Sequence, residues 1–354
     1  MLRPMRLDRD VPLAPLTTLN LGGNATHVAT IERESDVPDA LAEADRLGIA
    51  PFVLGGGSNL VVADEGVDAL VLRMALRGQQ VSLAGGVATV TLAAGEPWDP
   101  FVAFAVGEGL SGVECLGGIP GLVGATPIQN VGAYGQEVKD TIVSVRAYDR
   151  DARAFVDLTP DECDFGYRHS RLKATSRFIV VAATFALRRN DDSAPVRYAE
   201  LSRALGIAEG SVAPVARVHE TVVALRRTKG MVLDSADPES VSAGSFFVNP
   251  VVDDAALARI IEGAHTANAG EVPRHAAGEG KWKVPAAWLI ERAGFARGFA
   301  QGPVRVSKRH TLALVNDGGT TRELLALAKV LRDGVRERFG VELTPEPVMV
   351  GCRL

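Results

Sequence analysis

The segment that most limits how this chain can fold is residues 113–137, which read VECLGGIPGLVGATPIQNVGAYGQE with six glycines and two prolines. Glycine permits positive φ angles and close backbone approach, and proline fixes φ, so a segment rich in both holds irregular backbone in one shape. A linker is the alternative, but the segment also carries apolar residues that need burial, namely Ile119, Leu122, Val123, Ile128, Val131 and Tyr134. We therefore expect ordered backbone whose N–H groups bind a ligand.

Length and composition indicate a globular protein of two or three domains, because the chain has 354 residues, 47% hydrophobic and 23% charged. No apolar run approaches the ~20 residues of a bilayer helix, and the first residues lack an apolar signal core. We therefore expect a cytoplasmic protein without membrane contact. The net charge of −5 argues against nucleic-acid binding, which depends on neutralising phosphates.

Cysteine and histidine usage favours neither disulfides nor a metal site. The three cysteines, Cys115, Cys163 and Cys352, lie far apart and form no C-x-x-C pair, which suits a reducing compartment. The six histidines show no HExxH pattern and no close spacing to a cysteine. We expect no bound metal.

Hydrophobic periodicity predicts both helices and strands. Helices are expected at 36–47, 98–106, 214–229, 253–263, 285–293 and 320–339, and strands at 81–94, 142–158, 178–187 and the C-terminal tail. The last helix begins with a capping-box pattern from Thr320 to Glu323 and ends before Gly340. Residues 230–244 are rich in Ser, Asp, Gly and Pro, which predicts a hinge and a domain boundary near residue 235.

A glycine turn, Gly55-Gly56-Gly57-Ser58-Asn59, joins two apolar strands. Consecutive backbone N–H groups and a hydroxyl are the ingredients of a pyrophosphate-binding nest. The turn is not a Rossmann fingerprint, because Leu60 stands where the third glycine belongs, and it lacks the Gly-Lys-Ser/Thr of a P-loop. On its own it is equally consistent with a plain hairpin turn.

Several motifs together resemble one enzyme family. TTLNLGGNA, LGGGSNLVV and the 113–137 segment follow the order and spacing of the FAD-binding domain of UDP-N-acetylenolpyruvoylglucosamine reductases, also called UDP-N-acetylmuramate dehydrogenases. Similar motifs cover nearly the whole chain: DFGYRHSRLK at 164–173, AGSFFVNPVV at 243–252, PAAWLIERAG at 285–294 and LTPEPVMVG near the C-terminus. The FAD domain is shared with other flavin oxidases, whereas the Ser-Phe-Phe-x-Asn-Pro segment is not.

The resemblance implies an α+β fold. It combines the two-subdomain FAD-binding architecture of the PCMH or vanillyl-alcohol-oxidase type with a C-terminal α+β substrate domain. We expect the first FAD subdomain at 1–70, the second at 71–234 together with a return strand at 341–354, and the substrate domain at 235–340. We also expect a monomer.

The implied activity is NADPH-dependent, FAD-mediated reduction of UDP-N-acetylglucosamine enolpyruvate to UDP-N-acetylmuramate, in peptidoglycan precursor synthesis. The residues that the resemblance assigns to FAD are Leu54, Gly55, Gly56, Gly57, Ser58, Asn59, Glu114, Gly118, Ile119, Pro120, Gly121, Gly124, Asn130, Ala133, Tyr134 and Gly135. Those assigned to the substrate are Tyr167, Tyr198, Lys229 and Asn249. Tyr198 looks like the tyrosine of the mobile loop that one subtype of the family lays over its substrate.

Reduction of an enolpyruvyl ether needs a hydride on one alkene carbon, a proton on the other, and support for charge on the adjacent carboxylate. By resemblance Ser245 donates the proton, Arg168 binds the carboxylate through its planar guanidinium, and Glu346 supports the developing enol. Each has a plainer alternative, which is a capping serine, a surface ion pair and a solvated acid respectively.

The chain departs from the family pattern near its C-terminus. Val348 follows Glu346-Pro347 where many members have an arginine nearby, so Arg305 or Arg309 is a candidate replacement. Gln301 lies one position from the expected substrate-binding glutamine. Two other functions stay open on the sequence: an oxidase with covalently held flavin, and a non-catalytic protein that binds flavin or a nucleotide sugar.

Overall fold

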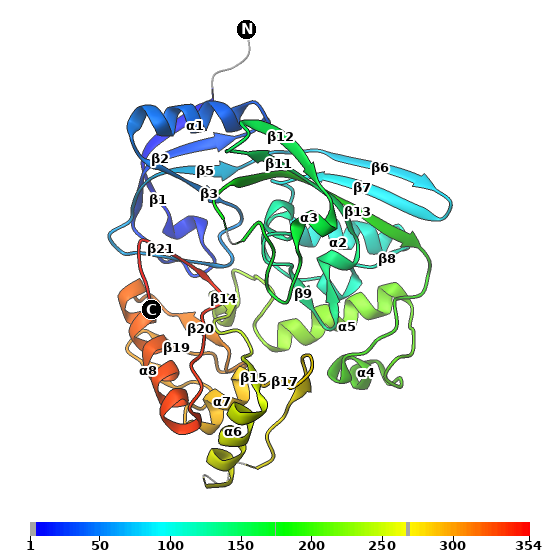
Figure 1. Ribbon diagram of the computed structural model, residues 1–354, viewed down its shortest axis with the longest axis vertical. Helices are drawn as coiled ribbons and strands as arrows, with labels where there is room; N and C mark the ends of the chain where they lie inside the picture. Colours follow the sequence, from blue (N-terminus) through cyan, green and yellow to red (C-terminus); the bar gives the residue numbers. More distant parts are fainter. Residues whose placement is uncertain (1–4, 174, 267–269) are drawn as a thin grey trace. The chain divides into compact units, whose positions relative to one another are not determined.

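The computed structural model describes residues 5–173, 175–266 and 270–354, and these divide into two units (Figure 1). Unit 1 comprises the described residues within Met1–Val11, Ala25–Gly56 and Asp68–Arg227. Unit 2 comprises those within Pro12–Asn24, Gly57–Val67 and Thr228–Leu354. The chain passes from one unit to the other inside the glycine turn at 55–59.

Unit 1 contains a four-stranded sheet in the order β1-β2-β5-β3, formed by β1 (Arg6–Pro12), β2 (Asn24–Ile31), β5 (Val67–Met74) and β3 (Ala50–Leu54). Helix α1 (Asp36–Leu47) covers it and agrees with the helix predicted at 36–47. It buries Val37, Ala40 and Ala44 in one core with strand residues. Gly48 ends the helix with φ 69°, a left-handed conformation that glycine adopts without strain.

A second, antiparallel sheet of unit 1 has the order β12-β11-β13-β7-β6, with β8 beside β13. Its strands are β6 (Gln79–Ala84), β7 (Val87–Ala93), β8 (Leu110–Ser111), β11 (Ile142–Asp149), β12 (Ala154–Leu158) and β13 (Phe178–Arg189). In Figure 1 the β6–β7 hairpin extends from this sheet as a two-stranded ribbon. The strand predicted at 178–187 is confirmed, whereas the runs at 81–94 and 142–158 each form two strands, separated by turns at 85–86 and 150–153.

Aromatic packing joins the second sheet to helix α2 (Trp98–Gly107). The ring centroids of Trp98, Phe101 and Phe185 lie 5.4–5.7 Å apart, and all three side chains are buried. Such pairs add roughly 0.5–1.5 kcal/mol to the burial of the rings. The other helices of unit 1 are α3 (Pro160–Cys163), α4 (Ala199–Leu205) and α5 (Val215–Thr228).

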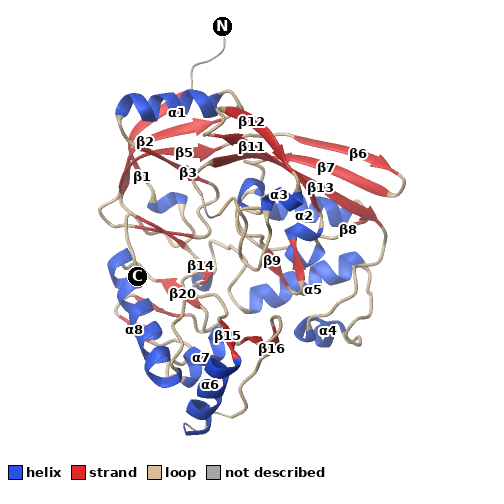
Figure 2. Ribbon diagram, viewed as in Figure 1, coloured by secondary structure: helices blue, strands red, loops and turns tan. Residues whose placement is uncertain are grey.

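Unit 2 is built on the sheet β14-β20-β19-β18, with β14 (Ser242–Ser245), β18 (Ala300–Gln301), β19 (Val304–Val306) and β20 (Ala313–Asn316). A smaller sheet contains β15 (Val251–Asp253), β16 (His275–Ala276) and β17 (Lys281–Lys283). Figure 2 shows the helices of this unit gathered beside these strands: α6 (Asp254–Thr266), α7 (Ala286–Arg292) and α8 (Thr321–Phe339).

Helix α8 confirms the capping-box prediction. The Thr320 hydroxyl accepts a hydrogen bond from the Glu323 N–H (3.2 Å), and the Glu323 carboxylate accepts one from the Thr320 N–H (2.8 Å). Its apolar face is fully buried at Leu324, Leu327, Ala328, Leu331 and Val335, and nearly so at Phe339. Within the described residues, no helix combines the length and apolar content needed to cross a membrane.

The C-terminal strand returns to a different partner than expected. We predicted that 341–354 would join the region 71–234, but β21 (Val348–Val350) pairs in parallel with β4 (Leu60–Val62) in unit 2. The pairing is fixed by burial, because Met349 and Cys352 pack into the same core as Val61. A short, mostly apolar tail carries no local signal for its distant partner.

Candidate functional site

The two glycine-rich loops meet in unit 1. A Cβ built on Gly56 would lie 2.7 Å from the Gly121 Cα, so the backbones of the 55–59 turn and the 113–137 segment touch directly. Gly118 and Gly121 have φ of 71° and 124°, which favour glycine. A Cβ on Gly124 would lie 2.5 Å from the Ala94 Cβ. Leu54, at the end of β3, is buried beneath the turn, and Ile119 and Pro120 are half-buried.

A tight hairpin lies further along the same segment. Strands β9 (Gly132–Ala133) and β10 (Gln136–Glu137) are joined by two residues, Tyr134 and Gly135, with φ of 49° and 88°. Two positive φ angles are the requirement of a type I′ hairpin turn, where Asn and Gly are the usual residues. A positive φ strains the backbone of a tyrosine. The strain is accepted here in a turn that carries an aromatic side chain at the hairpin tip.

Arg168 lies on a neighbouring turn and contacts this hairpin. Gly166 and His169 exchange two backbone hydrogen bonds (2.9 and 3.2 Å), which leaves Tyr167 and Arg168 at the tip. Arg168 has φ 52°, an uncommon conformation for a non-glycine residue and one that clusters at functional sites. Its Nη2 donates to the Gly132 carbonyl (2.7 Å), and its guanidinium lies 5.6 Å from the Tyr167 ring centroid.

Two tyrosines and a half-buried arginine complete this cluster in unit 1. Tyr198, the residue before α4, meets Tyr134 edge to face with ring centroids 5.3 Å apart. Burial raises the pKa of both phenols, so each is a neutral hydrogen-bond donor at neutral pH. Burial also lowers the pKa of Arg226, on α5, to about 10, opposed by Tyr134 and Asp99. Arg226 therefore remains a cation at neutral pH.

Unit 2 brings Ser245, Glu346 and Asn59 together. Ser245 ends β14 and pairs with Ala313, and the next residue, Phe246, accepts a hydrogen bond from the Glu346 N–H (2.9 Å). The Asn59 side chain donates to the Glu346 carbonyl (3.3 Å), and the Asn59 carbonyl accepts from the Val348 N–H (2.9 Å). Ser245, Glu346 and Asn59 are all half-buried. Glu346 lies in the loop before β21 rather than within the tail strand.

The N-terminal segment 12–24 also contacts this cluster. The Thr18 hydroxyl donates to the Ser242 carbonyl (2.7 Å), and the Thr18 N–H donates to the Gly57 carbonyl (3.1 Å). A Cβ on Gly57 would lie 1.9 Å from the Leu16 carbonyl oxygen, so only glycine fits there. Ser58 follows directly and is half-buried.

Three of the residues assigned to ligands use their side chains inside the protein. The fully buried Glu114 carboxylate accepts from the N–H groups of Gly112 (2.6 Å) and Ala194 (3.3 Å). The fully buried Asn130 amide donates to the Gly166 carbonyl (2.9 Å) and to Glu137 (3.0 Å), and it accepts from the Lys139 N–H (3.2 Å). These two side chains therefore shape the loops.

Asn249 also serves the fold, because its carbonyl oxygen accepts from the Ala286 N–H (2.9 Å) at the start of α7. Lys229 directly follows α5 and is half-buried. Arg305 is 8% exposed and pairs with Glu239 and Asp317, so it does not replace the missing tail arginine. Arg309 pairs with Asp237 at 2.5 Å.

Sequence reasoning missed the contacts of Asp99 and Thr18. The Asp99 carboxylate accepts from the Gly118 N–H (2.5 Å) and so fixes the glycine loop from α2. An aspartate in the first turn of a helix is common, and its long-range partner was visible only in the structure. Thr18 lay inside the TTLNLGGNA motif, which was a signal, although no role followed from it.

The residues fit FAD. Backbone-to-backbone contact between two glycine loops leaves peptide groups, rather than side chains, to face a pyrophosphate. The neutral Tyr134 phenol and the Arg226 cation nearby are suitable partners for a flavin ring and anionic oxygens. Among the residues placed by the structure, no group of three or more His, Cys, Asp or Glu gathers as metal ligands would.

Comparison with known proteins agrees with this arrangement. Residues 25–156 match the family model of an FAD binding domain, and residues 237–350 match that of the UDP-N-acetylenolpyruvoylglucosamine reductase C-terminal domain. The chain is 50% identical to the UDP-N-acetylenolpyruvoylglucosamine reductase of Streptomyces coelicolor, over 100% of this chain and 92% of the relative. It is 49% identical to that of Thermobifida fusca, over 98% of each chain.

A solved structure supports the same relationship. The crystal structure of UDP-N-acetylenolpyruvylglucosamine reductase from Thermus caldophilus aligns with a TM-score of 0.67 and 27% identity, covering 98% of this chain and 100% of the other. The expected fold class, an FAD-binding fold with a C-terminal substrate domain, is confirmed. With half its residues identical to a curated relative along its full length, this chain belongs to the UDP-N-acetylenolpyruvoylglucosamine reductase family.

Proposed function

We propose that this protein is an oxidoreductase that uses NADPH and FAD to reduce UDP-N-acetylglucosamine enolpyruvate to UDP-N-acetylmuramate, a step of peptidoglycan precursor synthesis. Family membership over the whole chain supports the reaction. The structural observation that carries the residue roles is the hydrogen bond from the Glu346 N–H to the Phe246 carbonyl. It holds the backbone of Glu346 next to the residue that follows Ser245, which supports the proposal that a proton donor and an acid act together in unit 2.

The glycine loops hold the cofactor. We assign to FAD the turn Leu54–Asn59, the segment 114–124 and the hairpin at Ala133–Gly135, which Glu114 and Asn130 shape from inside. Held by these loops, FAD would supply the hydride chemistry between NADPH and the terminal enolpyruvyl carbon. The protein's own part is to orient the substrate, exclude water and deliver the proton.

The catalytic roles are divided among three side chains. The Ser245 hydroxyl protonates the alkene carbon that does not receive the hydride. The Arg168 guanidinium binds the substrate carboxylate, which gains negative charge as the enol develops, and a permanently charged planar partner stabilises that charge. Glu346 supports the enol and resupplies the Ser245 proton. The positive φ of Arg168 supports its role, because such strain is retained where function requires it.

The nucleotide sugar is held by Tyr167, Tyr198, Lys229 and the amide of Asn249. We place this protein in the subtype with a tyrosine-bearing substrate loop. The contact of Tyr198 with Tyr134 supports this placement, because it puts the 190–213 segment against the hairpin that carries a proposed cofactor residue. Lys229 supplies a cation for the diphosphate.

We assign FAD binding to residues 1–234 as two subdomains, 1–70 and 71–234, and substrate binding to 235–340. The tail 341–354 returns to β4. We propose that the enzyme is a cytoplasmic monomer that does not bind nucleic acid. The net charge of −5 supports the last point.

The test uses a Ser245→Ala variant and measures the two half-reactions separately: reduction of the bound FAD by NADPH, and its reoxidation by the enolpyruvyl substrate. We expect it to bind FAD and to be reduced by NADPH like the parent, but to fail at reoxidation by the enolpyruvyl substrate without oxygen. Ser82→Ala, on the exposed hairpin strand β6, is the control. Normal reoxidation of Ser245→Ala would remove the proton-donor role, and flavin that stays on the denatured protein would favour the covalent oxidase instead.

A further inference from the structure

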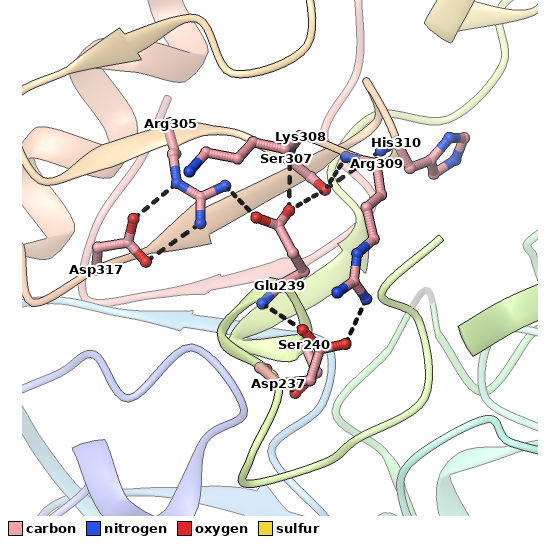
Figure 3. Close-up of polar contacts among 9 residues, drawn as sticks. All are labelled: Asp237, Glu239, Ser240, Arg305, Ser307, Lys308, Arg309, His310 and Asp317. Carbon is pink, nitrogen blue, oxygen red and sulfur yellow. Dashed lines mark hydrogen bonds and ion pairs between the residues drawn. The ribbon is translucent and has the colours of Figure 1, made fainter. Parts of the chain in front are cut away.

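A buried ionic cluster in unit 2 lies outside the residues discussed so far as catalytic. Its centre is Glu239, in the short 3-10 helix η5 (Pro238–Ser240), with 5% of its surface exposed. Its partners are Arg305 at 8% and Ser307 at 0% exposure (Figure 3). A buried carboxylate is costly unless it is hydrogen-bonded and paired, so such a group persists where it fixes a conformation.

Every oxygen of the Glu239 carboxylate is engaged. Oε2 accepts from the Ser307 hydroxyl (2.6 Å) and from the Lys308 N–H (2.9 Å), and Oε1 lies 2.8 Å from Arg305 Nη1. Arg305 Nε lies 2.7 Å from Asp317 Oδ2, and the Asp317 side chain is 41% exposed. Figure 3 shows that Glu239 connects η5 to this arginine and to the 307–310 turn, and that Arg309 of the same turn also pairs with Asp237, the N-cap residue of η5.

The two segments that Glu239 joins lead into the two strands that position Ser245. Residues 237–240 precede β14, and residues 307–310 precede β20. These strands pair through Ser242 with Val315 and Ser245 with Ala313. Ser242 and Ser245 are three positions apart on β14, whereas their partners Val315 and Ala313 are only two positions apart on β20, so the ladder is irregular immediately before Ser245.

Because of this bulge, strand pairing alone fixes Ser245 weakly. Gly244, inside the bulge, has φ 70°, and its N–H bonds to the Ser242 hydroxyl (3.2 Å). Bulges aim side chains near active sites, but they leave residues outside the regular ladder. The strand is also held by the Thr18 hydroxyl at Ser242 and by the backbone hydrogen bonds of Phe246, and the Glu239 contacts add a constraint at the start of both strands.

Glu239 also supports the residue after Lys229. Gly230 has φ 67°, and a Cβ there would lie 2.8 Å from the Glu239 Cβ and 3.0 Å from its carbonyl oxygen. This contact involves the backbone and Cβ of Glu239, not its carboxylate. A change of the carboxylate alone therefore leaves the contact between Glu239 and Gly230, the residue after Lys229, intact.

We propose that Glu239 is a positioning residue for proton delivery: its carboxylate ties η5 to Arg305 and the 307–310 turn and thereby holds the Ser245 hydroxyl in line with the substrate. The proposal rests on the proton-donor role proposed for Ser245. Glu239 touches neither substrate nor cofactor in this account. It acts through the geometry of β14.

The test compares Glu239→Gln with Asp317→Asn. Each removes one carboxylate from the same guanidinium, but only the first also weakens the hydrogen bonds that join η5 to Ser307 and Lys308. Misplacing a reacting group slightly costs up to about 100-fold in rate, so we expect Glu239→Gln to slow reoxidation by the enolpyruvyl substrate roughly 10- to 100-fold. Reduction by NADPH and FAD affinity should stay within about twofold, and Asp317→Asn should resemble the parent in both half-reactions.

The double variant Ser245→Ala/Glu239→Gln separates positioning from general destabilisation. If Glu239 acts through Ser245, the double variant reoxidises no more slowly than Ser245→Ala, because coupled residues are non-additive. Multiplied losses, equal slowing of both half-reactions, or a Glu239→Gln rate equal to the parent would overturn the proposal.

If Glu239→Gln does not fold, Ser307→Ala keeps both charges and removes the hydroxyl that donates to Oε2 and accepts from the Arg309 and His310 N–H groups. It should slow the same half-reaction by a smaller factor, and a rate equal to the parent would refute the inference. Failure of the proposed function is distinguishable, because the parent itself would then not be reoxidised by the substrate.

Discussion

Adding one methyl group at Gly56 tests whether the two glycine loops touch as the structure shows. In Gly56→Ala the new Cβ would lie 2.7 Å from the Gly121 Cα and 3.2 Å from its carbonyl carbon. Carbon atoms pack at about 3.5–4.0 Å, so a backbone must move by close to 1 Å. Overpacking of this kind costs about 1–3 kcal/mol, and we expect that loss in the unfolding free energy of the apoprotein.

The substitution should also weaken cofactor binding: if the apoprotein relieves the overlap by moving the loops apart, FAD must restore the contact at a cost of up to about 1–3 kcal/mol. At about 1.4 kcal/mol per factor of ten, 1–3 kcal/mol corresponds to a roughly 5- to 140-fold higher dissociation constant. Urea denaturation of the apoprotein gives the first quantity. Titration of the apoprotein with FAD, followed by quenching of flavin fluorescence, gives the second.

Gly55→Ala is the matched control for apoprotein stability. Its Cβ would meet only the Ala125 Cβ, at an ordinary 3.7 Å, and Gly55 does not have a positive φ. We expect its unfolding free energy to stay within about 0.5 kcal/mol of the parent. If Gly56→Ala were as stable as the parent, or both variants were equally destabilised, the contact between the loops would be refuted.

Three further outcomes follow from single contacts. Thr320→Ala removes the capping hydroxyl of α8 and should lower the unfolding free energy by about 1 kcal/mol in a urea titration; no loss would mean the cap is unimportant. The hydrogen-bonded Arg177 lowers the pKa of Asp149 to about 2, below its ordinary 3.8, so this carboxylate stabilises the fold above about pH 4 and the effect is lost as pH falls through about 2. The melting temperature of Asp149→Asn should therefore fall less over that range than the parent's, and parallel curves would contradict the pKa shift. Arg168→Lys keeps a cation but loses the planar fork, so single-turnover reoxidation by substrate should slow while reduction by NADPH is unchanged; slowing of both steps would point to a folding role.

Local signals in the sequence predicted the regular elements well. Helix α8 was recognisable because its capping box, its apolar face and Gly340 all lie within one stretch of chain. Helix α1 and the strands of the second sheet followed from periodicity for the same reason. The partner of β21 was missed, because pairing between positions nearly three hundred residues apart is decided by burial and leaves no local pattern.

The candidate site was predictable by residue type more than by contact. The resemblance pointed to Glu114 and Asn130 as cofactor residues, but the structure shows their side chains buried and bonded to the backbone of the loops. It left Arg305 as a candidate substrate contact, and burial against Glu239 excludes that use. The sequence alone does not show whether an arginine or a glutamate faces a ligand or the protein interior.

The most direct test of the account is anaerobic oxidation of NADPH by the purified FAD-containing protein, with and without UDP-N-acetylglucosamine enolpyruvate. We predict that without it NADPH is consumed only until the bound FAD is reduced, and that with it one NADPH is consumed for each UDP-N-acetylmuramate identified by mass. Reduced flavin that the enolpyruvyl nucleotide sugar leaves unchanged would contradict the proposed reaction.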